Sequence, residues 1–450
     1  MKKSIFLLLI LLFSGKLFSQ QLPSLKATVT DSSLTGYYFI SSGFLRDTTL
    51  LMVLDRYCDI AYYKAVPYAR GGFNFDLLLD GIMNYASVKR HYFMDTTFKL
   101  IDSLECRKLY KTDTHDMKML SNGHYLLLGA DTLKITVKKG MHAGIMIDRD
   151  TFAIVTMAVI QELDEKRKVV FEWHAKKHFS IEDVDPFFVS IESGIMDLQH
   201  VNSLEMDADS NFLLVSRNYN EVTKISRKNG SVIWRLGGKR NDFQFVNCPV
   251  PFYGPHDAQR IANGHITLLD NGRSQAPHGV RALEFELDEI NKVATLKWSY
   301  TYDPALYSQA HGNVQRLDNY KTLVNCGKVN DDLVFVVVDS AGRKLIELTS
   351  PDHLDSYRAY YYPSLPWTVN RPAITCFDSS GVSYLTTKET YAKYLWSDSS
   401  TIRTISVKKA GVYQVFVPYG NGGFVGSEKV VVTDVANVCR QIPVRKEEGK

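Results

Sequence analysis

The sequence predicts an all-β protein: a six-bladed β-propeller followed by a small C-terminal Ig-like β-sandwich. The first observation is a repeat, in which four strands joined by turns and a loop recur along residues 30–365. The second is a change of pattern at residue 366, where short alternating strands separated by Ser, Gly and Asp turns begin. Four-stranded units repeated around an axis are typical of a propeller, which closes on itself and leaves few exposed sheet edges.

Residues 1–20, MKKSIFLLLILLFSGKLFSQ, have the pattern of a signal peptide. Lys2 and Lys3 supply a charged start, and an apolar run from Ile5 to Phe13 follows. That run is too short to span a bilayer, and no longer apolar stretch follows it in the sequence. We therefore expect an exported protein without a transmembrane segment, located in the periplasm, at the cell surface or in the medium.

The overall composition argues against nucleic acid as a partner. The formal net charge is +4, and no dense block of Lys and Arg occurs, whereas nucleic-acid-binding proteins concentrate basic residues on one surface. The six cysteines stand singly, without CxxC pairs or metal-ligand spacing, so we expect no structural metal. Cys376 and Cys439 are candidates for a disulfide that would tie the C-terminal region together.

The first two repeat units span residues 37–66 and 75–105 and are rich in strand-forming residues. Each of the next four units begins with a histidine that stands shortly before a turn and a strand. Two further histidines, His124 and His265, directly follow Asn-Gly turns, and we expect these to face solvent at the opposite side of the propeller or at a blade edge. The four histidines that begin repeat units are His115, His200, His256 and His311.

The spacing of these four histidines supports equivalent positions in successive blades. His256 lies 56 residues after His200, and His311 lies 55 residues after His256. The interval from His115 to His200 is 85 residues, which indicates an insertion in that unit, within residues 174–196.

The first strand of each propeller blade lines the central channel, so a residue at its head points to the channel mouth. We therefore expect the four histidines to converge. Asn202 follows His200 on the same face of the expected strand, and Arg217 lies at the end of the adjacent strand. Several imidazoles, an amide and a guanidinium would form an electropositive cup that suits a tetrahedral oxyanion.

These segments carry a family resemblance. HVNS…VSR (200–217) and PHDAQR…NGHITLLDNG (255–272) resemble the PAPS-independent arylsulfate sulfotransferase family, most clearly over residues 110–330. Members of that family are exported six-bladed propellers that move a sulfuryl group from one phenol to another. The resemblance implies a ping-pong cycle through a sulfohistidine, with an aryl sulfate donor, a phenolic acceptor and no cofactor.

The resemblance also implies roles for individual residues. By its place in the repeats, His256 matches the nucleophile. A second set is implied to hold the sulfate group: His115, His200 and Arg217. Asn202 matches a nearby polar contact to substrate. His311 stands at a position where the family need not use a histidine, and we expect it either to contact substrate or only to line the channel.

The chemistry of sulfuryl transfer fits these residues independently of the resemblance. Like phosphoryl transfer, it needs an in-line nucleophile and charge stabilisation at the equatorial oxygens. We expect Arg217 to depress the pKa of His256 and so to keep this imidazole neutral and nucleophilic. A second imidazole would protonate the departing phenolate.

Three alternatives stay open at the level of sequence. A non-catalytic propeller could bind an anionic ligand or a glycan at the same cup. A hydrolase could release the sulfate to water instead of to a phenol. The histidines could bind a metal ion, although Arg217 in the same cup would repel a cation.

The C-terminal region completes the predicted organisation. Residues 366–435 are expected to form the Ig-like sandwich, with Trp396, Tyr413 and Val415 in its core. Residues 436–450 are expected to form a charged tail.

Overall fold

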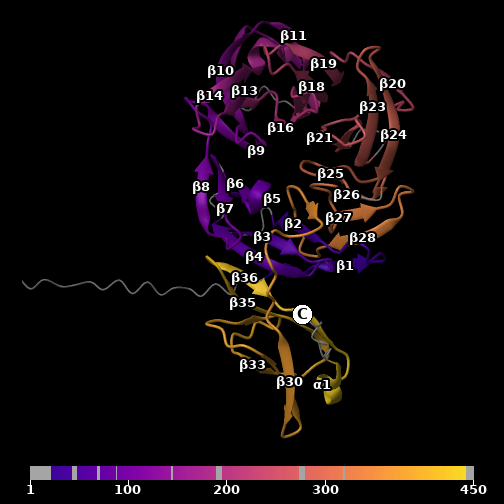
Figure 1. The fold of residues 1–450 in the computed structure, drawn as a ribbon. Coiled ribbons are helices and arrows are strands. Elements are labelled where there is room, and N and C mark those ends of the chain that lie inside the picture. The colour runs from indigo at the N-terminus through magenta and orange to yellow at the C-terminus, as the bar shows by residue number, and fades with distance from the viewer. Residues whose placement is uncertain are drawn as a thin grey trace, which may run out of the picture.

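The computed structural model describes residues 22–42, 48–67, 71–87, 89–142, 145–188, 195–272, 279–317 and 320–441. Within these ranges six sheets stand around a common axis like the blades of a propeller (Figure 1). The prediction of an all-β, six-bladed propeller is therefore confirmed. The predicted signal peptide at residues 1–20 lies outside the described residues. In the described part of the chain, no helix is long and apolar enough to cross a membrane.

Blades 2 to 4 follow one another along the chain, each with its first strand at the axis. The strands of blade 2 are β5 (Gly71–Leu77), β6 (Met83–Ser87), β7 (Arg90–Met94) and β8 (Leu100–Leu104). Blade 3 consists of β9 (Lys111–Met119), β10 (Tyr125–Val137), β13 (Thr151–Leu163) and β14 (Val169–His174), with β15 (Ile195–Asp197) parallel to β13. Blade 4 consists of β16 (Val201–Met206), β17 (Phe212–Ser216), β18 (Glu221–Ile225) and β19 (Val232–Gly237).

Blades 5, 6 and 1 complete the ring. Blade 5 consists of β21 (His256–Arg260), β22 (Ile266–Asp270), β23 (Arg281–Asp288), β24 (Val293–Thr301) and β20 (Gln244–Val246). Blade 6 consists of β25 (Asn313–Arg316), β26 (Thr322–Asn325), β27 (Leu333–Val338), β28 (Lys344–Thr349) and the N-terminal β1 (Lys26–Val29). Blade 1 consists of β29 (Tyr360–Tyr362), β2 (Tyr37–Ser41), β3 (Thr48–Leu54) and β4 (Ile60–Pro67).

The ring is closed by strands from both ends of the propeller sequence. β1 pairs with β28 at the rim of blade 6, and β29 pairs with β2 to become the innermost strand of blade 1. Residues from the two ends of the propeller thus share two sheets. An unpaired edge strand can pair with a strand of another molecule, and the pairing of β1 with β28 and of β29 with β2 covers such edges in blades 6 and 1.

The apolar core lies between neighbouring blades. Between blades 4 and 5, for example, Leu213, Trp234 and Phe285 are fully buried in one cluster. Burying a large apolar side chain contributes about 1.5–3 kcal/mol, so the stacked blade faces supply much of the stability. The inner strands are left to present polar side chains to the channel.

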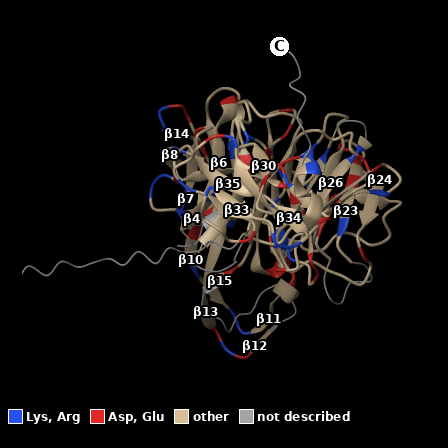
Figure 2. Ribbon diagram, turned by 90° about the horizontal axis from the view of Figure 1, so that it is seen from below, with Lys and Arg blue, Asp and Glu red and all other residues tan. Residues whose placement is uncertain are grey.

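The insertion in the third unit is larger than the predicted segment 174–196. That segment contains three short 3₁₀ turns (Ala175–Lys177, Ile181–Asp183 and Pro186–Phe188) and part of it becomes β15. The remaining length extends β10 and β13 into an arm (residues 131–157), which carries the hairpin β11 (Gly140–His142) and β12 (Ile145–Ile147). Figure 2 shows β11 and β12 projecting beyond the ring.

Polar clusters also join the blades, and they correct the prediction that His124 and His265 face solvent. His124 Nδ1 lies 2.6 Å from Glu162 Oε1 within blade 3, and Arg227 of blade 4 bonds the same carboxylate. His265 and Glu284 of blade 5 repeat the arrangement at 2.6 Å, with an arginine from blade 6 on the same carboxylate. The histidines after the Asn-Gly turns therefore help to fix neighbouring blades to each other.

The C-terminal region shares a sheet with the propeller. Its strand β36 (Gly423–Gly426) pairs with β4, so the sheet of blade 1 continues through β36, β35 (Val415–Tyr419) and β32 (Leu395–Trp396). A three-stranded sheet contains β30 (Ile374–Ser379), β31 (Val382–Thr387) and β33 (Thr404–Ser406). A two-stranded sheet contains β34 (Gly411–Tyr413) and β37 (Val430–Val432). The expected core residues Trp396, Tyr413 and Val415 are buried. The Ig-like topology stays a prediction, since a continuous sheet crosses its expected boundary at residue 366.

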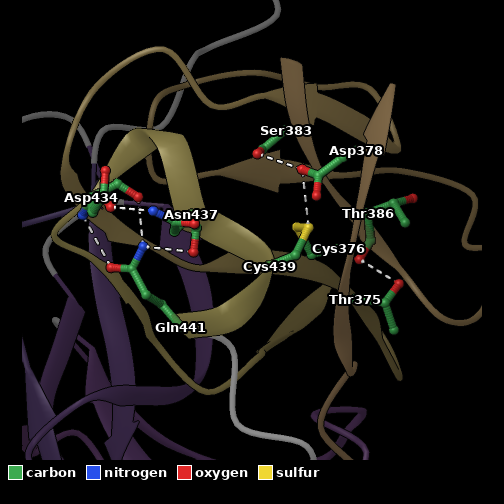
Figure 3. The surroundings of a disulfide bond; sticks show 9 residues. All are labelled: Thr375, Cys376, Asp378, Ser383, Thr386, Asp434, Asn437, Cys439 and Gln441. Carbon is green, nitrogen blue, oxygen red and sulfur yellow. Dashed lines mark hydrogen bonds between the residues drawn. A yellow bond between two sulfur atoms is a disulfide. The ribbon is translucent and has the colours of Figure 1, made fainter. Parts of the chain in front are cut away.

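A disulfide joins the last helical turn of the described chain to this region. Cys439 in α1 (Val438–Gln441) is bonded to Cys376 on β30 (Figure 3). The side-chain oxygen of Gln441 accepts hydrogen bonds from the backbone N–H groups of Thr433 and Asp434. The tail expected from residue 436 therefore begins with ordered turns, and residues 442–450 lie outside the described chain.

Candidate active site

The heads of the inner strands bring the four histidines to one end of the channel. His256 is the first residue of β21, His200 directly precedes β16, and His311 lies two residues before β25. His115 lies within β9, in a bulge where the register with β10 is interrupted. The rings of His115 and His200 are 4.9 Å apart, and the backbone N–H of His311 lies 3.2 Å from Nε2 of His256. We call these four residues the mouth histidines.

His256 is buried, and its hydrogen bonds define its tautomer. Nδ1 lies 3.0 Å from the carbonyl oxygen of Gly254, so Nδ1 carries the proton and donates. Nε2 accepts the backbone N–H of His311 and therefore holds the lone pair. Burial, followed by the nearby Arg217 guanidinium, holds the pKa of His256 well below its usual range. The expected effect of Arg217 is present, but burial is the larger cause.

The segment Gly254-Pro255-His256 is fixed by side chains of the neighbouring blade. Gly254 has a φ of 57°, and its N–H donates to the side-chain oxygen of Asn220 at 2.7 Å. The side-chain amide of Asn202 donates to the carbonyl oxygen of Pro255 at 2.8 Å. A side chain at residue 254 would meet the ring of Phe188 at 3.2 Å, so a glycine is needed there for space as well as for its backbone angle.

The three remaining mouth histidines each pair through Nδ1 with an aspartate. The Nδ1–carboxylate distances are 2.5 Å for His115–Asp113, 2.6 Å for His200–Asp197 and 3.0 Å for His311–Asp355. Burial opposes the charged form of His115, but Asp113 outweighs it and raises the pKa of His115. For His200 burial dominates, and its pKa is lowered despite Asp197.

Arg217 lies beside the histidines, in a 3₁₀ turn (Arg217–Tyr219) that follows β17. Its backbone N–H donates to the carbonyl oxygen of His200 at 3.0 Å. Its guanidinium donates to the carbonyl oxygen of Gln309 at 2.9 Å and stacks over the ring of Phe188 at 4.5 Å. The guanidinium is thus held between two blades and a loop, near His256 and His200.

Asn202 lies beneath the imidazoles and is fully buried. Its amide contacts Pro255, and its backbone oxygen accepts hydrogen bonds from Arg358 at 3.0 Å and from the hydroxyl of Tyr357 at 3.3 Å. The structure therefore gives Asn202 a contact to the loop that carries His256. The predicted contact to substrate stays a prediction.

A buried ionic cluster that we did not predict closes the channel below the mouth histidines. Arg358 lies 3.3 Å from Asp116 and 3.4 Å from Asp257, and all three side chains are almost completely buried. Bulges in β9 and β21 direct these aspartates toward the axis. Asp257 therefore pairs with Arg358 rather than with the ring of His256. The sequence did contain a signal, since both aspartates follow a mouth histidine as an His-Asp pair.

Two aromatic-lined pockets lie at the mouth. One has a volume of about 200 Å³ and is lined by Phe73, Thr114, His115, His311 and Tyr357. The other has a volume of about 150 Å³ and includes Phe187, Phe188, Arg217, Gly254 and Tyr307 in its lining. Tyr357 was not predicted, because it is brought to the mouth by the closing strand β29 from far along the chain. Pockets with aromatic walls and a few convergent polar groups suit small aromatic ligands.

The fold and the site together define a six-bladed propeller with a neutral histidine among cationic groups at its channel mouth. The sequence model of the arylsulfotransferase (ASST) family matches residues 24–362, which include all six blades. The chain therefore belongs to the arylsulfotransferase family. No curated protein matches the chain.

Several solved structures are distantly similar. A protein of unknown function from Bacteroides caccae has a TM-score of 0.46 and 10% identity, covering 73% of this chain and 99% of its own. A streptogramin B lyase has a TM-score of 0.38 and 10% identity over 85% of this chain and 98% of its own. Virginiamycin B lyase from Staphylococcus aureus has a TM-score of 0.34 and 8% identity over 81% of this chain and 96% of its own. At this distance they carry no argument about function.

Proposed function

We propose that this protein is an exported aryl-sulfate sulfotransferase, which passes a sulfuryl group from an aryl sulfate to a phenol through a sulfohistidine at His256. The observation that carries the proposal is the tautomer of His256. Its proton is committed to the carbonyl oxygen of Gly254, and its Nε2 lone pair accepts the backbone N–H of His311. A neutral imidazole with a defined lone pair is a competent nucleophile.

In the first half of the cycle, Nε2 of His256 attacks the sulfur of the aryl sulfate. The N–S bond forms as the bond from sulfur to the phenolic oxygen breaks, and the phenol leaves after taking up a proton. In the second half, an acceptor phenol loses its proton and attacks the same sulfur, and the N–S bond breaks. Both halves use the same groups in reverse, as a ping-pong cycle requires.

Charge at the transferring group would be stabilised by Arg217 and by His115, whose pairing with Asp113 favours the imidazolium. His200, oriented by Asp197, would donate a further hydrogen bond. The His311 N–H that contacts Nε2 at rest could turn to a sulfuryl oxygen once the N–S bond forms. The aromatic pockets would hold the phenyl ring.

The test mixes purified mature protein with p-nitrophenyl sulfate and excess phenol and follows nitrophenol release. We expect release that depends on phenol and is abolished in His256→Asn, with the sulfate recovered as phenyl sulfate. The matched control is His353→Asn, since the side chain of His353 is exposed and lies 3.0 Å from the carboxylate of Asp332. Release without added phenol would indicate a hydrolase instead.

A second candidate is a non-catalytic propeller that binds an anionic ligand at the mouth histidines. The half-buried Arg217 guanidinium favours it, because an anion would satisfy that charge. Such a protein would be stabilised by sulfate against heat, in proportion to the logarithm of the sulfate concentration. It would show no turnover and no labelled histidine with a radioactive aryl sulfate.

Export rests on residues 1–20 of the sequence, and we propose the periplasm or the cell surface as the location. Cell fractionation with an antibody against the propeller tests this. Recovery of the protein in the cytosolic fraction, with residues 1–20 still attached, would contradict it.

A further inference from the structure

His311 has a strained backbone that several contacts hold in place. Its φ is 69°, a left-handed value that non-glycine residues adopt only when their surroundings require it. The carbonyl oxygen of His311 accepts the side-chain amide of Asn271 at 2.9 Å, and the next N–H, of Gly312, donates to the carbonyl oxygen of Tyr357 at 2.9 Å. Strain of this kind marks positions where the placement of a side chain matters more than local stability.

The imidazole of His311 is oriented by Asp355. Its Nδ1 lies 3.0 Å from Oδ1 of the carboxylate, and both side chains are about one-seventh exposed. The other oxygen of Asp355 is buried and has no hydrogen-bond partner among the described residues. The imidazole is therefore the hydrogen-bonding partner of this carboxylate, an arrangement that fixes the orientation of a histidine ring.

The same imidazole borders the pocket that suits a phenyl ring. His311 and Tyr357 line this pocket, with their ring centroids 5.0 Å apart, and Phe73 forms another wall. The backbone of His311 is in hydrogen-bond contact with Nε2 of His256. A phenyl ring in this pocket would lie against the imidazole of the residue whose backbone N–H contacts the nucleophile.

We propose that the His311–Asp355 pair is the general acid and base of the transfer, acting on the phenolic oxygen of donor and acceptor. This inference rests on the proposed function. In the first half, protonated His311 gives its proton to the oxygen that leaves sulfur, and a neutral phenol departs. In the second half, neutral His311 takes the proton of the acceptor phenol as its oxygen attacks the sulfur and the bond to His256 breaks. The proton returns to His311, and the cycle balances.

His115 also borders this pocket, but its environment suits another role. Asp113 raises the pKa of His115 against the effect of burial, which favours the imidazolium, the form whose charge complements that of the sulfate group. An acid and base must instead change protonation in each half of the cycle.

The experiment compares two donors that differ in leaving group, phenyl sulfate and p-nitrophenyl sulfate, with one phenolic acceptor. The variants are His311→Asn, in which asparagine tolerates the left-handed backbone, and Asp355→Asn; the control is His353→Asn from the same loop. Loss of a general acid costs about 10²–10⁴-fold when the leaving group needs a proton. The quantity compared is kcat/KM for the donor, because in a ping-pong cycle it reports only the first half-reaction. We expect kcat/KM to fall by that factor for His311→Asn with phenyl sulfate and by less than about tenfold with p-nitrophenyl sulfate, whose anion leaves unaided. Asp355→Asn should show the same selectivity to a smaller degree.

The possible outcomes distinguish a failure of the acid–base role from a failure of the proposed sulfotransfer. Wild-type protein that transfers from neither donor would overturn the proposed sulfotransfer and the acid–base role with it. Active wild type with equal losses of donor kcat/KM on both donors would overturn the acid–base role alone and assign His311 to positioning His256. Unchanged activity of His311→Asn on phenyl sulfate would also overturn the acid–base role. Thermal unfolding of each variant establishes that it is folded.

Discussion

Replacing Arg358 with methionine removes the cation on which two buried carboxylates depend. Arg358 lies 3.3 Å from Asp116 and 3.4 Å from Asp257, and it is 2% exposed. Breaking a buried ion pair costs about 3–5 kcal/mol, because the remaining charge stays buried without compensation. Methionine keeps much of the side-chain volume, so the loss comes from charge rather than from a cavity. With an unfolding entropy of about 2.1 cal/mol/K per residue over 450 residues, Tm should fall by about 3–5 °C.

The unfolding free energy lost in Arg358→Met should depend on pH, and the loss should be smaller at low pH. Burial favours the neutral form of both carboxyl groups, and Arg358 is the largest influence against it; the balance lowers the pKa of Asp116 and raises the pKa of Asp257. Without Arg358 both pKa values rise, so the folded state binds protons more tightly than the unfolded state. The penalty is then present at neutral pH and is relieved as the pH falls through the folded pKa values. The gap in unfolding free energy between wild type and variant should therefore narrow from about pH 8 to about pH 5.

The assay is urea unfolding at several pH values, on wild type, Arg358→Met, and Arg358→Met combined with Asp116→Asn and Asp257→Asn. The combined variant replaces the whole ionic cluster by neutral groups, a change that is often neutral or stabilising, and it should recover most of the lost stability. A gap that is constant with pH, or a combined variant no more stable than Arg358→Met, would refute the electrostatic account. Lys118, which lies 3.7 Å from Asp116, limits the cost at that carboxylate and sets the lower end of the range.

Two further predictions concern the mouth and the C-terminal region. Asp113→Asn removes the carboxylate that raises the pKa of His115, so the alkaline limb of the pH–rate profile should move to lower pH. The profile is measured as kcat/KM for p-nitrophenyl sulfate. An alkaline limb at the same pH in variant and wild type would contradict a charged role for His115. Replacing Cys376 and Cys439 by serine removes a cross-link between residues 63 positions apart and should lower stability by about 4 kcal/mol through chain entropy, with sulfotransfer preserved; equal thermal unfolding of variant and wild type would contradict it.

The fold could be predicted because its signals are local and repeated. Strand patterns, turn residues and the equal intervals between His200, His256 and His311 all point to the same unit. What escaped prediction depends on pairings between distant segments. The strand β1 joins blade 6 and β29 joins blade 1, and no local pattern distinguishes these strands from others. The same is true of β36, whose pairing with β4 merges the C-terminal region with the propeller.

The site residues also fall into those that local patterns predict and those that depend on contacts between distant segments. The mouth histidines and Arg217 could be found because repeat register fixes where each lies. Their partners could be found only in part: Asp113 and Asp197 precede their histidines by two and three residues, whereas Asp355 lies 44 residues after His311. Arg358 and Tyr357 reach the channel through ring closure. The environment of His124 was misjudged because its partner, Glu162, lies 38 residues away on another strand and is itself bonded by Arg227 of the next blade.

The Nδ1 partner of each mouth histidine separates two properties that one imidazole cannot combine. A nucleophile needs a neutral ring with a free lone pair, whereas a group that holds sulfate benefits from a positive charge. A carboxylate at Nδ1 favours the charged form, as it does for His115, whereas a carbonyl oxygen orients the ring without adding a full negative charge. His256 alone among the four contacts a carbonyl oxygen at Nδ1, from Gly254, two residues earlier in its own loop. The sharp turn at Gly254 and Pro255 therefore has a chemical role as well as a structural one, since it orients the ring through a carbonyl oxygen, which opposes the effect of burial less than a carboxylate would.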